Sequence, residues 1–118
     1  MSTSDLLRWQ WEGYRRYHRG KFNLLLHIVV VPLFLVGNVG IIVALARGAW
    51  PLAFAGLLVM VASVVLQSRG HKMEAVPPEP FTSPSNAVAR IFLEQWITFP
   101  RFVLSGGWWR ALRQHSTS

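Results

Sequence analysis

The sequence predicts an all-α membrane protein in which a two-helix transmembrane hairpin is flanked by amphipathic interfacial helices. Hydrophobic residues make up 52% of the 118-residue chain, more than a soluble domain of this length usually needs. They are concentrated between Ile28 and Leu66, where Arg47 is the only charged residue. Such a density over this length is typical of segments that face lipid. We therefore expect one membrane domain over residues 1–118.

The distribution of basic residues predicts the orientation of this domain. The net charge is +7, and every Lys and Arg except Arg47 lies outside the apolar region. Since positive charge favours the cytoplasmic side, both termini are expected in the cytoplasm. The protein itself is expected in the inner membrane of a bacterium or in the endoplasmic reticulum of a eukaryote. Attraction to anionic lipid accounts for the positive net charge. Membrane lipid is therefore the expected partner, and no nucleic acid is expected. The chain has no cysteine, which excludes disulfides and thiolate ligands.

The first expected element is an amphipathic interfacial helix over residues 4–19, with Ser4 as a candidate N-cap. Its apolar face is predicted by side chains at helical spacing, and arginines occupy much of the remaining surface, as in helices that lie among headgroups. Gly20 then ends the helix. The spaced residues are Leu7, Trp11, Tyr14 and His18.

Two transmembrane helices are expected next, over residues 22–46 and 51–70. The apolar part of the first alone would span roughly 28 Å, close to the hydrocarbon thickness of a bilayer. Since the turn between them is short, the helices must be antiparallel, so His27 and His71 emerge at the same membrane face. Gly37 and Gly40 suit close helix contacts, including contacts between copies of the chain in a homo-oligomer.

The residues after the hairpin are expected to be irregular first and helical later. Four prolines between residues 77 and 84 favour an extended segment. Ser85 is the candidate cap of a third amphipathic helix over residues 85–105, interfacial or re-entrant because its charged residues oppose a third crossing. These are Arg90, Glu94 and Arg101, opposite an apolar face of Val88, Phe92, Trp96, Phe99 and Val103. The tail after Gly107 is expected to fray, with His115 as an uninvolved surface residue.

The candidate site consists of His18, His27 and His71 with the carboxylate of Glu74. On one continuous helix His18 and His27 would lie on opposite faces, roughly 13 Å apart along the axis, but a break at Gly20 lets the first helix fold back. Imidazoles with one carboxylate are the ligands expected for non-haem iron, and zinc or manganese also accepts them. The alternative is that these are ordinary polar residues of the membrane interface. Side chains able to orient the ligands or a bound oxygen species are Tyr14, Asn23 and Gln67.

These residues resemble a known family. The pattern runs Tyr14-x-x-x-His18-x-x-x-x-Asn23-x-x-x-His27, then a membrane hairpin, then Gly70-His71-x-x-Glu74 followed by Pro77 and Pro78. It is similar to the iron-dependent 2-hydroxy fatty acid α-dioxygenase family of small membrane proteins, and the resemblance covers about residues 10 to 100.

The resemblance implies an Fe(II)-dependent oxidation that uses dioxygen to remove one carbon from a 2-hydroxy fatty acid, giving an aldehyde one carbon shorter. It makes the three histidines iron ligands, and Glu74 either a fourth ligand or the proton acceptor for the 2-hydroxyl. Tyr14 and Asn23 would assist at the same site. The substrate carboxylate would pair with Arg69, Lys72 or Arg19, and the acyl chain would lie along the hairpin in lipid.

Two other functions are compatible with the same residues. One is a non-catalytic membrane protein with a structural or lipid-organising role, whose histidines only lie in the interface. The other is a zinc-dependent lipid hydrolase, because the ligand types do not distinguish iron from zinc. Bound iron and a requirement for dioxygen would distinguish the dioxygenase from both.

Overall fold

The computed structural model describes residues 2–114, and within that range the chain forms α-helices, one π-helix and connecting turns without a β-strand. The expectation of an all-helical protein is confirmed for this part of the chain. His115, expected from the sequence to be uninvolved, lies outside the described residues.

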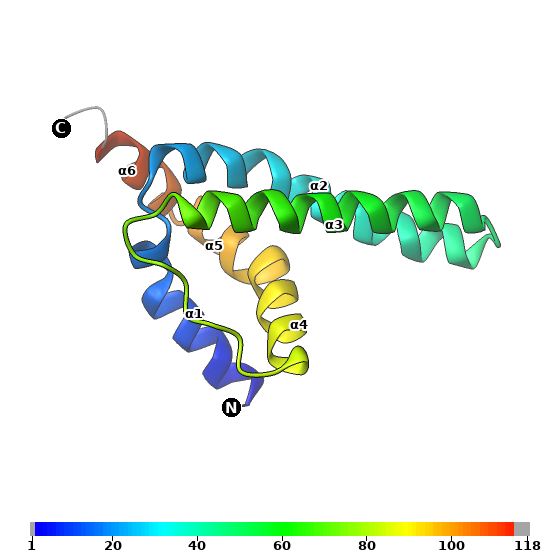
Figure 1. Ribbon diagram of the computed structural model, residues 1–118, viewed down its shortest axis with the longest axis horizontal. Coiled ribbons are helices and arrows are strands. Elements are labelled where there is room, and N and C mark those ends of the chain that lie inside the picture. Colours follow the sequence, from blue (N-terminus) through cyan, green and yellow to red (C-terminus); the bar gives the residue numbers. More distant parts are fainter. Residues whose placement is uncertain (1, 115–118) are drawn as a thin grey trace.

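The two longest helices, α2 (Lys21–Ala46) and α3 (Trp50–Lys72), run side by side in opposite directions (Figure 1). With 26 and 23 residues they extend roughly 39 Å and 34 Å. Both are long and apolar enough to cross a membrane. The turn between them contains Gly48, whose φ of 67° is a left-handed conformation that glycine adopts without strain.

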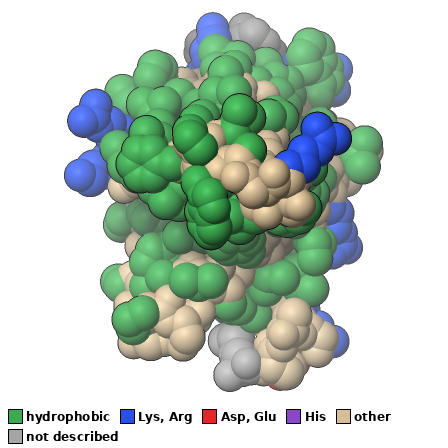
Figure 2. Space-filling view, turned by 90° about the vertical axis from the view of Figure 1, so that its right-hand side faces the viewer, with side chains coloured by type: hydrophobic (Ala, Val, Ile, Leu, Met, Phe, Trp, Pro, Cys, Tyr) green, Lys and Arg blue, Asp and Glu red, His purple; other side chains and the backbone are tan. Residues whose placement is uncertain are grey.

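Large apolar side chains remain exposed along both long helices, among them Val36, Phe54 and Leu58. Figure 2 looks onto the end of the pair where α2 turns into α3, and hydrophobic side chains cover most of that face. Exposing large contiguous apolar areas to water is unfavourable, so a surface of this kind suits an apolar environment.

The two long helices approach each other closely at a pair of glycines. A Cβ added to Gly37 would lie 2.9 Å from the Gly56 carbonyl oxygen, and one added to Gly56 would lie 2.9 Å from that of Gly37. Gly37 thus makes a close contact between helices of the same chain, and it is not open for a contact between copies. Gly40 has no neighbour near its Cβ position and remains open for a contact with another molecule.

The first helix, α1 (Thr3–Tyr17), begins one residue before the expected start. Ser2, and not Ser4, is its N-cap, because the Ser2 hydroxyl accepts a hydrogen bond of 3.2 Å from the Asp5 N–H. Asp5 also places a negative charge in the first turn, where the helix dipole favours it.

The single helix expected over residues 85–105 is divided into three elements: α4 (Pro84–Leu93), the π-helical turn η1 (Glu94–Thr98) and α5 (Phe99–Leu104). Its N-cap is Ser83, not the expected Ser85, because Pro84 fits the first helical position and the Ser83 hydroxyl accepts the Asn86 N–H at 3.0 Å. The proline-rich segment before it is irregular, as predicted.

A further helix, α6 (Gly107–Gln114), occupies the part of the chain expected to fray. It is held by the Trp108 indole N–H, which donates a 2.8 Å hydrogen bond to the Leu24 carbonyl oxygen. Gly107 packs so closely on Phe102 that a Cβ there would lie 2.7 Å from the ring. The expectation of a frayed tail was wrong because aromatic contacts to distant residues stabilise this helix.

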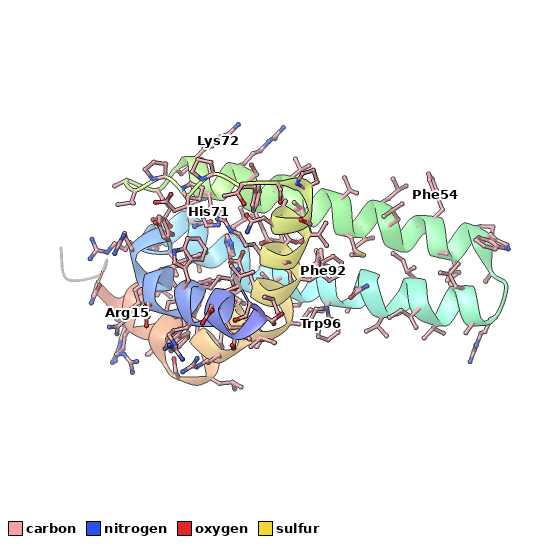
Figure 3. All side chains as sticks on the ribbon, turned by 90° about the horizontal axis from the view of Figure 1, so that it is seen from below. Arg15, Phe54, His71, Lys72, Phe92 and Trp96 are labelled. Atoms are coloured by element: carbon pink, nitrogen blue, oxygen red, sulfur yellow. The ribbon has the colours of Figure 1, made fainter. Side chains whose placement is uncertain are left out.

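The shorter helices gather against one half of the α2–α3 pair and leave the other half uncovered (Figure 1). The limit of the covered half is marked by the Trp96 indole N–H, which donates to Asn38 Oδ1 at 2.9 Å, and by the contact of Phe34 with Phe92 (Figure 3). The buried core of this half consists of Tyr14, Leu24, Val31, Phe99 and Phe102.

Candidate metal centre

The break between α1 and α2 brings His18 and His27 together. α1 ends at Tyr17, α2 begins at Lys21, and Gly20 in an extended conformation is the N-cap of α2. The ring centroids of His18 and His27 lie 4.9 Å apart, and both side chains are buried. The predicted break at Gly20, with the first helix folding back, is confirmed.

His71 reaches the same point from the last turn of α3. Its ring centroid lies 4.7 Å from that of His18 and 5.1 Å from that of His27. The three rings are nearly perpendicular to one another, at interplanar angles of 81–87°. The structure therefore brings together all three histidines that the sequence predicted, from three different elements.

The carboxylate of this cluster is Glu94, at the start of the π-helical turn. Its Oε2 lies 3.3 Å from His18 Nε2 and 3.8 Å from His27 Nε2. The ligand atoms of the three histidines and Glu94 all lie within 4.8 Å of one another. π-helical turns occur often at functional sites. In this turn the consecutive residues Glu94 and Gln95 both line the same cavity.

Hydrogen bonds fix the tautomers of His18 and His27. The Nδ1–H of His18 donates to the Tyr14 carbonyl oxygen at 2.9 Å, and that of His27 to the Asn23 carbonyl oxygen at 3.0 Å. Because a carbonyl can only accept, the Nε2 atom of each ring carries a lone pair toward the cluster when the ring is neutral. Backbone carbonyls are common partners of the second ring nitrogen in metal-ligating histidines.

Three imidazole nitrogens in this cluster are buried without a hydrogen-bond partner: His18 Nε2, His27 Nε2 and His71 Nδ1. Buried polar atoms normally have hydrogen-bond partners, so three that lack one and converge beside a carboxylate need an explanation. A divalent metal ion bound by three nitrogens and one oxygen would supply it. The donor set fits such an ion.

Electrostatics keep Glu94 ionised. Burial alone would raise the pKa of its carboxyl, but the facing His18 and the charges of His27 and His71 when protonated outweigh burial and lower this pKa to about 2. The Tyr14 hydroxyl donates a 2.8 Å hydrogen bond to Glu94 Oε2. Burial and the Glu94 charge raise the pKa of Tyr14, so its phenol remains a neutral donor.

Glu74, the carboxylate expected from the sequence, has different neighbours. Its oxygens accept hydrogen bonds from the backbone N–H groups of Arg19 and Gly20 at 2.9–3.0 Å and from Asn23 Nδ2 at 2.8 Å. It caps the N-terminus of α2, where Gly20 offers no side chain. Glu74 and Asn23 thus connect the turn before α2 to the end of α3.

Gln67, also expected near the ligands, pairs with Gln95 instead. The two amides exchange hydrogen bonds of 2.8 and 2.9 Å, and Gln67 also donates to the Ser63 hydroxyl at 3.0 Å. All three side chains are buried. The pair connects α3 to η1 and so holds the segment that carries Glu94.

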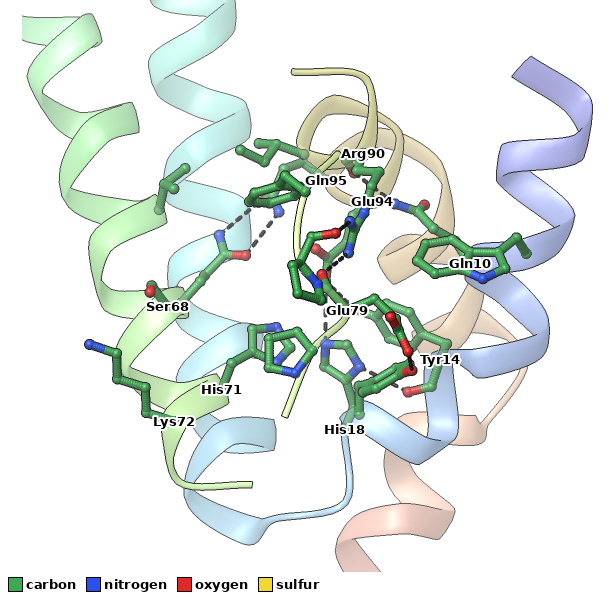
Figure 4. Close-up of a pocket in the computed structure, with 18 residues that line it drawn as sticks. Gln10, Tyr14, His18, Ser68, His71, Lys72, Glu79, Arg90, Glu94 and Gln95 are labelled. Atoms are coloured by element: carbon green, nitrogen blue, oxygen red, sulfur yellow. Dashed lines mark hydrogen bonds and ion pairs between the residues drawn. The ribbon is translucent and has the colours of Figure 1, made fainter. Parts of the chain in front are cut away.

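A cavity of about 390 Å³ lies beside the cluster and is lined by His18, His71 and Glu94 (Figure 4). Of the three cations expected to bind a substrate carboxylate, Lys72 lines this cavity, whereas Arg69 and Arg19 are not among its lining residues. The volume is that of pockets that bind small organic molecules.

Sequence reasoning missed Glu94 because it assigned this residue to the polar face of an amphipathic helix. The sequence feature that could have indicated Glu94 is its uncharged surroundings, since Glu94 is the only charged residue between Ile91 and Phe99. A lone carboxylate in an otherwise apolar stretch usually has a partner, because an unpaired charge is costly to bury.

Comparisons with known proteins do not assign this site. The chain matches no family model, and no similar curated protein or solved structure was found. The function must therefore be argued from the geometry of the site.

Proposed function

We propose that this protein is a membrane-bound Fe(II)-dependent dioxygenase that acts on 2-hydroxy fatty acids and releases an aldehyde one carbon shorter. The carboxyl carbon would leave as carbon dioxide, and dioxygen would accept the two electrons and two protons and leave as hydrogen peroxide. The observation that carries the proposal is the convergence of three unpaired buried imidazole nitrogens on the carboxylate of Glu94. The order of histidines around two apolar helices, which resembles the 2-hydroxy fatty acid α-dioxygenases, supports the choice of reaction.

The ion would be held by His18, His27, His71 and Glu94. Bound ferrous iron supplies the oxygen-binding and redox chemistry that this oxidation requires. Tyr14 orients Glu94 through its hydroxyl, and the carbonyl oxygens of Tyr14 and Asn23 orient two of the imidazoles. Glu74 has a positioning role, because the three donors it accepts from lie in the turn that brings His18 to His27 and in the first turn of α2.

The substrate carboxylate pairs with Lys72 at the mouth of the cavity. The 2-hydroxyl carbon then faces the side chains of His71 and Glu94, which line the same cavity. Apolar side chains dominate the remaining walls, which suits a hydrocarbon chain and limits the entry of water.

In this proposal α2 and α3 cross the membrane as a hairpin, with the cluster near the cytoplasmic face. The support is the length of both helices, their exposed apolar side chains and the position of Arg47 as the only cation at the turn. Both termini would then be cytoplasmic. Gly40, open on the surface of α2, is the position for a contact in a homo-oligomer.

The metal is tested by elemental analysis of protein purified in detergent under reducing conditions with iron supplied. The wild type should contain about one iron per chain. His71→Ala and Glu94→Ala should contain little. Glu12→Gln, which changes an exposed carboxylate outside the cluster, is the matched carboxylate control and should retain iron. Zinc in place of iron would favour a hydrolase, and the absence of any metal from wild-type protein purified anaerobically would overturn the proposal.

The reaction is tested by oxygen consumption in iron-loaded wild-type protein. A 2-hydroxy fatty acid should stimulate consumption and give the shortened aldehyde, whereas the unsubstituted fatty acid of equal length should not. Glu94→Ala should abolish the stimulated rate. Equal rates with both acids, or no aldehyde from the hydroxy acid, would exclude this chemistry even if iron is bound.

A further inference from the structure

The cavity beside the metal cluster follows one stripe of α3. Val64, Gln67, Ser68, His71 and Lys72 recur at the spacing of one helix face and all line it. The stripe extends roughly 12 Å along the helix axis, from Lys72 at the charged end of α3 to Val64 in its apolar part. The cavity therefore has a polar end and an apolar end.

The opposite wall is formed by α4 and η1, with Ile91 facing the same space as Val64. Both side chains are partly buried, whereas Val61 and Val65, next to Val64 on α3, are about half exposed. The apolar end of the cavity is thus continuous with the surface of α3 that would face lipid. A hydrocarbon chain that starts in the cavity can leave it there without entering water.

The polar end has one available cation. The Arg90 guanidinium also lines the cavity, but it donates to the carbonyl oxygens of Glu79 and Pro80 at 2.8 and 3.0 Å. It also lies over the rings of Trp9 and Phe81, at 4.8 and 4.5 Å from their centroids. Arg90 thus fastens the proline-rich segment as a wall of the cavity.

Lys72, by contrast, is exposed. Among the described residues that line the cavity, Lys72 is the cation without a hydrogen bond, ion pair or ring contact. It is the group at this end that is available to an anion.

We propose that Val64 and Ile91 determine the chain-length specificity of the site by forming the passage through which the alkyl chain of a single-chain carboxylate passes from the cavity into lipid. The carboxylate lies at Lys72, the second carbon lies beside His71 and Glu94, and the distal chain passes between Val64 and Ile91. This inference rests on the proposed function for the identity of the reacting end. The path proposed for the alkyl chain rests on the residues that line the cavity alone.

The test is equilibrium binding to metal-free protein in detergent, with radiolabelled 2-hydroxyhexadecanoic acid and 2-hydroxyoctanoic acid as probes. Val64→Trp narrows the passage and should weaken binding of the long acid by about tenfold or more while leaving the short acid within about twofold. Ile91→Trp should give the same pattern. Lys72→Gln should weaken both acids equally, because both carry the carboxylate.

Val65→Trp is the matched control, because Val65 is the next residue on α3 but does not line the cavity. It should bind both acids like the wild type. Val64→Ala, which cannot obstruct the passage, should also retain both. Equal binding of the long acid by wild type and Val64→Trp would overturn the inference, and so would a loss of both acids in Val64→Trp or a selective loss in Val65→Trp.

This measurement requires neither iron nor turnover. A protein without iron that shows the predicted binding pattern would overturn the dioxygenase while leaving the passage intact. An iron-dependent oxidase whose chain-length preference ignores Val64 and Ile91 would overturn the passage alone.

Discussion

The Tyr14 hydroxyl and the Glu94 carboxylate, 80 positions apart in the sequence, are joined by a hydrogen bond of 2.8 Å. Tyr14 also stacks on His18, with ring centroids 3.8 Å apart. One side chain therefore positions two of the four proposed ligands, an imidazole through its ring and a carboxylate through its hydroxyl.

Tyr14→Phe should lower the affinity for the metal by about 10- to 100-fold, because it removes only the donor to Glu94 and leaves the aromatic contacts intact. Competition with a chromophoric chelator measures the affinity. Tyr17→Phe is the control, since its hydroxyl contacts Glu79 at 3.5 Å, and Glu79 is not one of the four proposed ligands. Unchanged affinity in Tyr14→Phe would show that the hydrogen bond does not orient the ligand.

The stability of the metal-free protein should depend on pH through Glu94. Its pKa is about 2 in the folded chain and near 4.5 ordinarily, so its ionised form stabilises the fold above the ordinary value. That contribution is lost as the pH falls from about 4.5 toward about 2. Glu94→Gln lacks it at every pH.

Thermal unfolding of both metal-free proteins in detergent, from about pH 7 down to about pH 2.5, measures this contribution. The difference in Tm between wild type and Glu94→Gln should be constant above about pH 5 and should shrink below it. A difference that stays constant into the acid range would contradict a depressed pKa for Glu94.

The Gln67–Gln95 pair should show strong coupling. Gln67→Leu leaves the buried amide of Gln95 without its partner and should destabilise the protein by about 1–3 kcal/mol. The double variant Gln67→Leu/Gln95→Leu removes both polar groups and should cost clearly less than the sum of the single variants. Additive losses in chemical unfolding would show that the two amides act independently.

Gly70→Ala should destabilise the protein by about 1–3 kcal/mol, because its Cβ would collide with the Asn23 side-chain oxygen. Asn23 would have to move, and with it the hydrogen bond to Glu74. Gly40→Ala, on the adjacent long helix, has no atom within 4 Å of the new Cβ and should be neutral or stabilising by up to about 1 kcal/mol. Thermal unfolding of both variants compares them directly.

The sequence could predict the parts of the site that depend on local rules. A glycine after a basic turn predicted the break that brings His18 and His27 together, and two long apolar stretches predicted α2 and α3. Glu94 could not be placed in the same way. Its position depends on a π-helical turn and on a hydrogen bond to Tyr14, and neither leaves a periodic pattern in the sequence.

The same limit applies to Glu74 and α6. The spacing of His71 and Glu74 suits one helix face, but α3 ends at Lys72, so Glu74 turns toward the start of α2. The sequence of α6 is typical of a basic tail, and the helix is held by the hydrogen bond from Trp108 to the Leu24 carbonyl oxygen. In each case a contact between distant residues overrides the local pattern.

Synthesis from the N-terminus delivers the four donor residues at different times. His18, His27 and His71 are all made before Glu94, which follows 23 residues after His71. At about 5–20 residues per second, the nascent chain holds three imidazoles without their carboxylate for roughly 1–5 s. The four donor residues can therefore come together only after η1 has been made, so the proposed metal would be bound late in the maturation of the chain.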